Sequence, residues 1–257
     1  MDTGNRGVVQ TIVNVLQRTS GRDKIARIIQ YGGLFIAWLI DKYNLPQHFV
    51  KKIIRVMIRR ESLSNAVRAM SSSAGNARKV FRLFGYIEQL RSAVSALSLI
   101  DPNKMLLVSS AKLCAAGYLF CDNLVWVNSV NIISLNADKW KKYEYRFWLT
   151  QIALNSLRDF YEWCLIGIRE IERINSARTG EVIPLEPKPI HTRLLSICSL
   201  NKDLIMDSIT NIMDLTIPLT KLGYTHIPEH MIGLIGLITS ILRLIPIISP
   251  IYKLPYS

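Results

Sequence analysis

The sequence predicts an all-α fold: a helical integral membrane protein with N-terminal amphipathic helices and a C-terminal transmembrane helix. Three observations predict this class. Apolar residues make up 49% of the 257 residues, which excludes a disordered chain. They recur at helical spacing over long segments, and residues 231–251 are apolar enough to cross a bilayer. The formal net charge of +13 indicates an anionic partner, either phospholipid or nucleic acid.

The positive charge is concentrated in the N-terminal half. Residues 1–112 contain 18 Lys/Arg and 6 Asp/Glu, whereas residues 137–230 contain 12 of each sign. A nucleic-acid-binding protein of this charge usually also contains a recognition motif, and we find none. We therefore expect an anionic phospholipid membrane as the partner, and no nucleic acid.

The first helical region runs from Val8 to Asp41 and is interrupted at residues 19–23. Ser20, with Asp23 three residues later, resembles a capping pair that begins a second helix. Pro46 disfavours helix just before it, so the region ends there. Its apolar run is too short to span a bilayer.

Residues 47–60 form the most informative predicted helix, because its apolar and basic residues occupy opposite sides. We expect the apolar side to insert into a membrane and the basic side to bind anionic lipid. The inserting residues are Phe49, Val50, Ile53, Ile54 and Met57, and the lipid-binding residues are Lys51, Lys52, Arg55 and Arg59.

A second amphipathic helix is predicted over residues 76–91. Here Val80, Phe81, Phe84 and Ile87 are the expected inserting residues, and Arg78, Lys79 and Arg82 the expected lipid-binding residues. From residue 47 to residue 91 there are 10 Lys/Arg and only two acidic residues. A solvated basic face over an ordinary core remains an alternative, but the shortage of acidic partners favours a membrane surface.

Two longer apolar segments follow, at residues 105–135 and 147–168. The first contains Lys112 and Asp122, and the second contains Arg158 next to an aspartate. A charge at the centre of a bilayer costs about 2.5–3.5 kcal/mol on insertion scales, so such residues belong inside a helical bundle. We expect Asp122 and Arg158 to form an ion pair between the two segments.

The strongest membrane signal is residues 231–251, which contain eight isoleucines, four leucines and a single charge, Arg243. Gly233 and Gly236 are small residues that permit close helix approach, and we expect them to mediate oligomerisation. A buried core helix is the alternative for this segment. Three closely spaced prolines mark residues 172–192 as a linker.

Sequence motifs for catalysis are missing. We find no phosphate-binding loop, dinucleotide fingerprint, hydrolase nucleophile elbow or zinc-protease motif. The four cysteines form no Cys-x-x-Cys pair and have no histidine at ligand spacing. We therefore predict a protein that is not an enzyme and that has no cofactor and no metal site.

Four stretches together resemble the peroxin-11 family of peroxisomal membrane proteins, specifically its animal alpha/beta type. They appear in the family's order and span nearly the whole chain; only Arg243, inside the last apolar segment, departs from the pattern. The stretches are residues 20–31 (SGRDKIARIIQY), 76–83 (NARKVFRL), 120–126 (FCDNLVW) with 156–162 (SLRDFYE), and 218–224 (PLTKLGY) continuing into 233–242 (GLIGLITSIL).

The resemblance implies a multi-pass protein of the peroxisomal membrane with both termini in the cytosol. It also implies homo-oligomerisation, elongation of the membrane before peroxisome division, and recruitment of dynamin-type fission machinery through tail-anchored adaptors. The family's amphipathic helices correspond to residues 47–60 and 76–91. One family-type domain is expected over residues 1–257, divided into a basic cytosolic region (1–104), an apolar hairpin (105–171), the linker (172–192) and C-terminal helices (193–257).

The expected mechanism is a wedge. An amphipathic helix that lies in one leaflet expands that leaflet and favours positive curvature, and each nearby Lys or Arg adds about 1 kcal/mol of attraction to an anionic surface. Two other classes of protein remain possible. The polar-interrupted segments 105–135 and 147–168 would also suit a channel for small metabolites, and a soluble helical scaffold would need no membrane.

Overall fold

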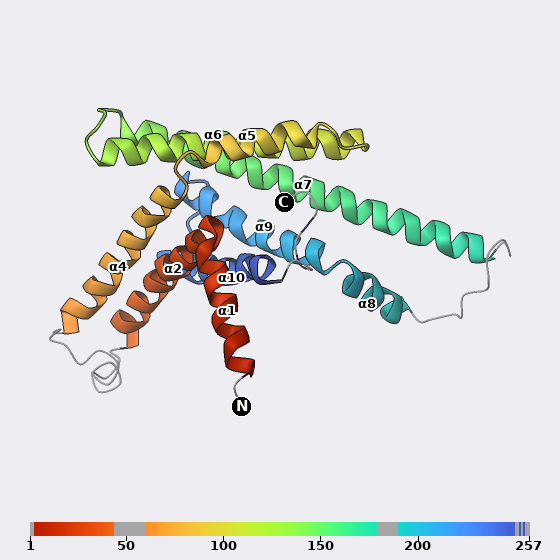
Figure 1. The fold of residues 1–257 in the computed structure, drawn as a ribbon, viewed down its shortest axis with the longest axis horizontal. Helices are drawn as coiled ribbons and strands as arrows, with labels where there is room; N and C mark the ends of the chain where they lie inside the picture. The colour runs from red at the N-terminus through yellow and green to blue at the C-terminus, as the bar shows by residue number, and fades with distance from the viewer. Residues whose placement is uncertain (1–2, 44–59, 179–189, 250–251, 253, 255–257) are drawn as a thin grey trace.

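The structure, a computed structural model, describes residues 3–43, 60–178 and 190–249, together with residues 252 and 254. Within these ranges the chain forms nine α-helices and no β-strand, which confirms the all-α prediction (Figure 1). The helices are α1 (Thr3–Gln17), α2 (Thr19–Tyr43), α4 (Arg60–Phe81), α5 (Gly85–Ala96), α6 (Pro102–Ser129), α7 (Ala137–Arg178), α8 (Ile190–Leu200), α9 (Lys202–Lys221) and α10 (Glu229–Ile248).

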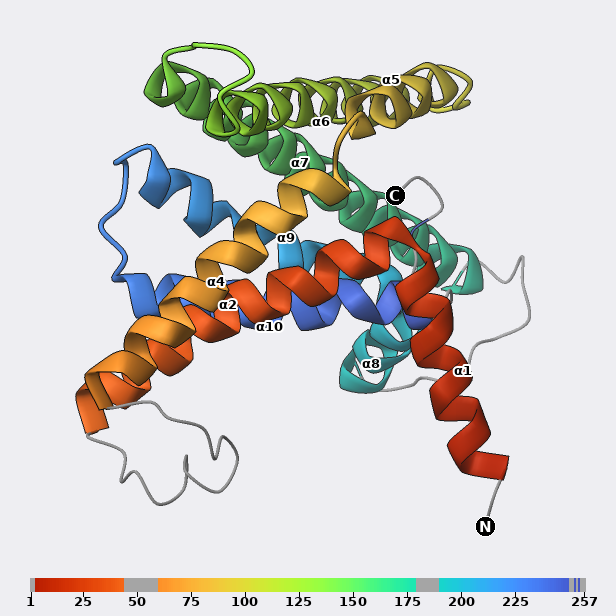
Figure 2. The ribbon, with the colours of Figure 1, turned by 60° about the vertical axis from the view of Figure 1, so that its left-hand side comes forward.

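The helices form two packed groups. In the first group α2 packs between α4 and α10, and in the second α5 and α7 both pack along α6 (Figures 1 and 2). Helix α9 contacts α7 on one side and α10 on the other, so it joins the groups. A small apolar cluster of Tyr31, Ile217 and Ile232 lies where α2, α9 and α10 meet.

The turn between α4 and α5 divides the amphipathic helix predicted over residues 76–91. Helix α4 ends at Phe81, and Phe84 adopts a left-handed conformation (φ 59°) immediately before α5 begins. The reason lies in the packing: α4 runs along α2 whereas α5 runs along α6, so the chain must change direction between them (Figure 2). The prediction of one continuous helix here was wrong.

The α6–α7 hairpin agrees with the two apolar segments expected at residues 105–135 and 147–168. The Asp101 side chain accepts hydrogen bonds from the backbone N–H groups of Asn103 and Lys104, which caps the start of α6. Helix α7 is longer than expected and continues to Arg178, so the first part of the predicted linker, residues 172–178, is helical. The prolines of that linker lie outside the described residues.

Large apolar side chains face outward in this fold, while many charged and polar side chains are buried. Among the described residues, Asp122, Thr239 and Ser240 have no exposed surface, whereas Phe84 is 66% exposed and Val94 68%. Soluble proteins rarely bury charges and leave large apolar side chains on the surface, but lipid-facing helices have this distribution. Two described helices, α6 and α10, are long and apolar enough to cross a membrane.

Candidate lipid-facing surface and polar interior

Helix α5 carries a continuous apolar stripe on its outer side. Ile87 is 56% exposed and follows Phe84 by three residues, so the two share one face of the helix. We refer to this surface as the α5 stripe, and its residues are Phe84, Ile87, Leu90, Val94 and Leu97. An amphipathic helix packed on one side only leaves such a stripe available for lipid.

Three of the four inserting residues predicted for the second amphipathic helix are exposed. Phe84 and Ile87 belong to the α5 stripe, and Val80, at the end of α4, is 45% exposed. Phe81 is half-buried. Their exposure is consistent with insertion, which stays a prediction.

The basic residues predicted to bind lipid beside this stripe point inward instead. Arg78 donates a hydrogen bond from Nε to Asp23 Oδ1 (3.0 Å) and another to Gln30 Oε1 (2.8 Å). Lys79 and Arg82 both form ion pairs with Asp122, at nitrogen–oxygen distances of 3.5 and 2.8 Å. The lipid-binding assignment of Arg78, Lys79 and Arg82 is therefore replaced by an internal one. Their acidic partners come from α2 and α6, which a local helical pattern does not reveal.

The ion pair expected between Asp122 and Arg158 is not formed, because each residue has other partners. Asp122 is fully buried beside Arg82. Arg158 instead forms ion pairs with Asp159, its neighbour in sequence, and with Asp207 of α9. Both residues are buried charges inside a bundle, as expected; only the partners were wrong.

Arg243, the unexpected charge in the last apolar segment, has a buried partner. Its Nε donates to Asp214 Oδ2 (2.9 Å), and its Nη2 donates to Asn211 Oδ1 (3.0 Å). Arg27 of α2 donates to the other oxygen of the same carboxylate, Asp214 Oδ1 (2.6 Å). Asp214 therefore joins α2, α9 and α10. A buried charge in a mostly apolar helix is expected to have such a partner.

Gly233 and Gly236 provide close helix packing, but within the chain. A Cβ atom at Gly236 would lie 2.4 Å from the ring of Tyr31, and one at Gly233 would lie 3.0 Å from the backbone nitrogen of Phe35. Both contacts are made by α2. The small residues were interpreted correctly as a helix-packing device, but the structure fills that face with α2 rather than with a second copy of the chain.

Electrostatics favour the charged forms of two interior carboxylates, Asp23 and Asp214. Burial by itself raises the pKa of Asp23, but Lys24, Arg78 and Arg82 outweigh it and hold that pKa below its usual range. Burial also raises the pKa of Asp214, but Arg27 and Arg243 outweigh it and hold that pKa below its usual range. Glu144 differs: burial and the nearby Asp122 raise its pKa to about 7, against Lys79, Arg82 and Lys141.

Several predicted residues lie outside the described part of the chain. They belong to the first amphipathic helix, which was predicted over residues 47–60 and of which only residue 60 is described. The predicted site residues among them are Phe49, Val50, Ile53, Ile54, Met57, Lys51, Lys52, Arg55 and Arg59. Their roles remain predictions from the sequence. Within the described residues, no group of three or more His, Cys, Asp or Glu side chains is arranged to hold a metal ion.

Comparison with known proteins extends over almost the whole chain. Residues 9–248 match the family described as peroxisomal biogenesis factor 11 (PEX11). Peroxisomal membrane protein 11A of Homo sapiens is 26% identical over 92% of this chain and 95% of its own length. Peroxisomal membrane protein 11A of Mus musculus is 24% identical over 96% of this chain and 99% of its own length. Peroxisomal membrane protein 11B of Bos taurus is 24% identical over 92% of this chain and 96% of its own length. No solved structure matches the chain.

Proposed function

The chain belongs to the peroxisomal biogenesis factor 11 family, and from this membership we propose that it is a peroxisomal membrane protein that curves and elongates the membrane during peroxisome division. Its relatives are named as peroxisomal membrane proteins. The proposal assigns no catalytic role to the chain.

The exposed α5 stripe is the observation that best supports the proposal. Phe84, Ile87 and Val94 are all more than half exposed, and burying one such side chain in an apolar environment stabilises by about 1.5–3 kcal/mol. Arg78, Lys79 and Arg82 are already paired with Asp23 and Asp122. Lipid attraction at this stripe therefore rests on apolar insertion, whereas residues 47–60 supply the basic face.

Insertion of both surfaces into one leaflet produces the curvature. Residues 47–60 occupy the headgroup region, about 5–10 Å deep, whereas α5, which packs along the spanning helix α6, lies among the acyl chains; both add area to that leaflet relative to the other. Helices α6 and α10 keep the protein in the bilayer, with both termini in the cytosol. Homo-oligomers concentrate many wedges at one place, and the curved membrane recruits dynamin-type fission machinery through tail-anchored adaptors.

Tubulation of liposomes by the full-length chain tests the wedge. Ile53→Glu combined with Met57→Glu places two charges on the inserting side of residues 47–60, and we expect tubules to be lost. The matched control is Ile132→Glu, at an exposed position (70%) in the α6–α7 turn, and it should tubulate normally. Unchanged tubulation by the double variant would refute the wedge.

Membrane residence is tested separately by alkaline carbonate extraction of peroxisomes. An integral protein remains in the pellet, and the soluble-scaffold alternative requires release into the supernatant. A peripheral surface helix alone would also be released, so retention specifically supports the spanning role of α6 and α10.

A second candidate function is a pore for small metabolites, and one observation favours it: charged side chains line cavities inside the helical bundle. The purified chain would then conduct in planar bilayers, with an ion selectivity that changes when a lining cation such as Lys24 is neutralised. Absence of conductance in bilayers that the protein still deforms would eliminate this candidate.

A further inference from the structure

A cavity of about 210 Å³, partly open to the surface, lies where α2, α4, α5, α6, α7, α9 and α10 approach one another. We refer to it as the cationic cavity. Two carboxylates, Asp23 and Asp214, line it. Five basic side chains also line it, and they are Lys24, Arg27, Arg78, Arg82 and Arg243. The lining therefore carries a formal excess of three positive charges, one of which, on Arg82, is also paired with Asp122 outside the lining.

The two carboxylates are already engaged by all five of these cations. Asp23 accepts from Arg78 and forms ion pairs with Lys24 at 3.1 Å and with Arg82 at 3.8 Å, and Asp214 accepts from both Arg27 and Arg243. Donor groups nevertheless remain unused: Arg27 is only 4% exposed, and its buried Nε has no hydrogen-bond partner. A buried donor without a partner is expected to bind a ligand or to destabilise the fold.

Lys24 experiences this excess of charge directly. Burial, together with Arg27, Arg243 and Arg78, lowers the pKa of Lys24 to about 8 against the opposing effect of Asp23. A bound anion would offset the mutual repulsion of these cations. The cavity is thus electrostatically incomplete as it stands.

We propose that the cationic cavity binds a phosphate group. Guanidinium groups present planar pairs of N–H donors that match phosphate oxygens, and several of them converge here. A phosphate monoester carries up to two negative charges, which is close to the excess on the lining. The volume corresponds to about seven water molecules in the liquid, which accommodates one phosphate group together with a few waters.

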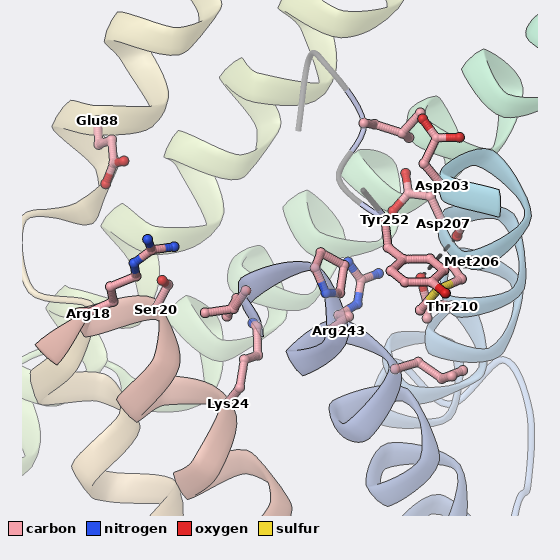
Figure 3. Close-up of a pocket in the computed structure, with 14 residues that line it drawn as sticks. Arg18, Ser20, Lys24, Glu88, Asp203, Met206, Asp207, Thr210, Arg243 and Tyr252 are labelled. Atoms are coloured by element: carbon pink, nitrogen blue, oxygen red, sulfur yellow. Dashed lines mark hydrogen bonds between the residues drawn. The ribbon is translucent and has the colours of Figure 1, made fainter. Parts of the chain in front are cut away.

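A neighbouring cavity of about 340 Å³ provides an internal comparison (Figure 3). Lys24 and Arg243 line both cavities, so the two adjoin. The larger cavity is balanced in charge, because Arg18 and these two cations face Glu88, Asp203 and Asp207. The larger cavity therefore adjoins the proposed phosphate site but does not have the excess of positive charge of the cationic cavity.

The phosphate site goes beyond membrane curvature and does not depend on it. Failure of the wedge would show as unchanged tubulation by the variant that combines Ile53→Glu and Met57→Glu, whereas failure of the phosphate site would show only in binding measurements.

Lys24→Gln is the most informative variant, because Asp23 keeps Arg78 and Arg82 as partners when Lys24 is lost. The full-length chain in phosphatidylcholine nanodiscs is titrated calorimetrically with inorganic phosphate, with ionic strength held constant by sodium chloride. We expect binding by the unaltered chain and an affinity about tenfold or more weaker in the variant, equivalent to losing one charge-assisted hydrogen bond.

Two control variants locate the effect. Lys139→Gln removes the same charge from an exposed position on α7, and Arg18→Gln removes a cation that lines only the larger cavity. Both should bind phosphate as the unaltered chain does. Loss of binding in Arg18→Gln with retention in Lys24→Gln would place the anion in the larger cavity and overturn the proposal.

The source of the phosphate is identified with nanodiscs that contain phosphatidic acid, followed by native mass spectrometry. Retention of the lipid by the unaltered chain but not by Lys24→Gln identifies a lipid headgroup as the ligand. Binding of free phosphate without lipid retention identifies a soluble phosphate compound. Equal behaviour of the unaltered chain and Lys24→Gln in both experiments would overturn the proposal.

Discussion

The last turn of α4 and the helix that follows it, α5, are adjacent in sequence but face opposite environments. Arg78 and Lys79 of α4 turn into the bundle and meet Asp23 and Asp122. Ile87 of α5, nine residues after Arg78 in the sequence, faces outward. Basic residues therefore do not mark the lipid-facing side when buried acidic partners are supplied by other helices.

The interior and the outer surface of the molecule differ in the interactions that they make. The interior depends on charge pairs between distant segments, such as Arg27 with Asp214. The outer surface carries exposed apolar side chains, such as Phe84 and Ile87, that we propose to insert into lipid. Substitutions in the interior should affect stability, and substitutions on the α5 stripe should affect membrane shaping.

Loss of Asp214 should have the largest effect on stability. Asp214→Ala leaves the buried Arg27 and the half-buried Arg243 without their shared carboxylate, and breaking a buried pair by removing one partner costs about 3–5 kcal/mol. Thermal unfolding in detergent micelles measures this. Asp138→Ala, an exposed acidic residue in the first turn of α7, should change the free energy of unfolding by less than about 1 kcal/mol. Equal effects would show that the interior pairing does not stabilise the fold.

Gly236→Ala should have the next largest effect. Its Cβ would meet the ring of Tyr31 at 2.4 Å, so α2 and α10 must separate, and overpacking of this kind costs about 1–3 kcal/mol. Gly167→Ala is the matched control, because nothing lies within 4 Å of that Cβ, and it should stabilise by about 0.5–1 kcal/mol. Light scattering should show the same oligomeric state for both variants. An altered oligomer with unaltered stability would restore the oligomerisation role predicted for this glycine.

Glu144 should make stability depend on pH in the neutral range. Its pKa is about 7 in the folded protein against an ordinary value of 4.5, so the folded state binds the proton more tightly. Its contribution is favourable below pH 4.5 and is lost as the pH rises to 7. Glu144→Gln should therefore stabilise by about 2 kcal/mol at pH 8 and have little effect at pH 4.

The control for this pH dependence is Glu172→Gln, an exposed carboxylate on the same helix, α7. It should leave the difference between the unfolding free energies at pH 8 and pH 4 unchanged. Destabilisation by Glu144→Gln at pH 8 would mean that the ionised carboxylate forms a necessary pair with Lys79 or Arg82.

Helical periodicity and apolar length predicted most of the helices correctly. The α6–α7 hairpin and the C-terminal apolar helix follow from features that extend over only a few turns. The break expected at residues 19–23 falls instead at Arg18, and residues 19–23 are helical in α2. The break at Phe84 does not, because the local pattern through residues 76–91 is continuous. It arises from the different packing partners of α4 and α5, which are remote in sequence.

The same limit explains the corrected pairs. Asp122 and Arg158 were identified correctly as buried charges, because a charged side chain in a long apolar segment is costly unless it lies inside a helical bundle. Their partners, Arg82 and Asp207, lie 40 and 49 residues away in sequence, and no spacing rule connects them. Gly233 and Gly236 were likewise identified as packing residues, but a sequence does not say whether the opposing helix belongs to the same chain.

The smallest effect on stability is expected on the α5 stripe, and it provides the sharpest contrast with the interior. Ile87→Ser and Val94→Ser replace exposed residues, so each should change the free energy of unfolding in detergent by less than about 0.5 kcal/mol. Together they remove two apolar side chains that we propose to insert into lipid, and tubulation of liposomes should fall. Ile132→Ser, equally exposed but in a turn, should leave both measurements unchanged. A double variant that unfolds readily would place the stripe in the packed core, whereas one that tubulates normally would leave residues 47–60 as the only wedge.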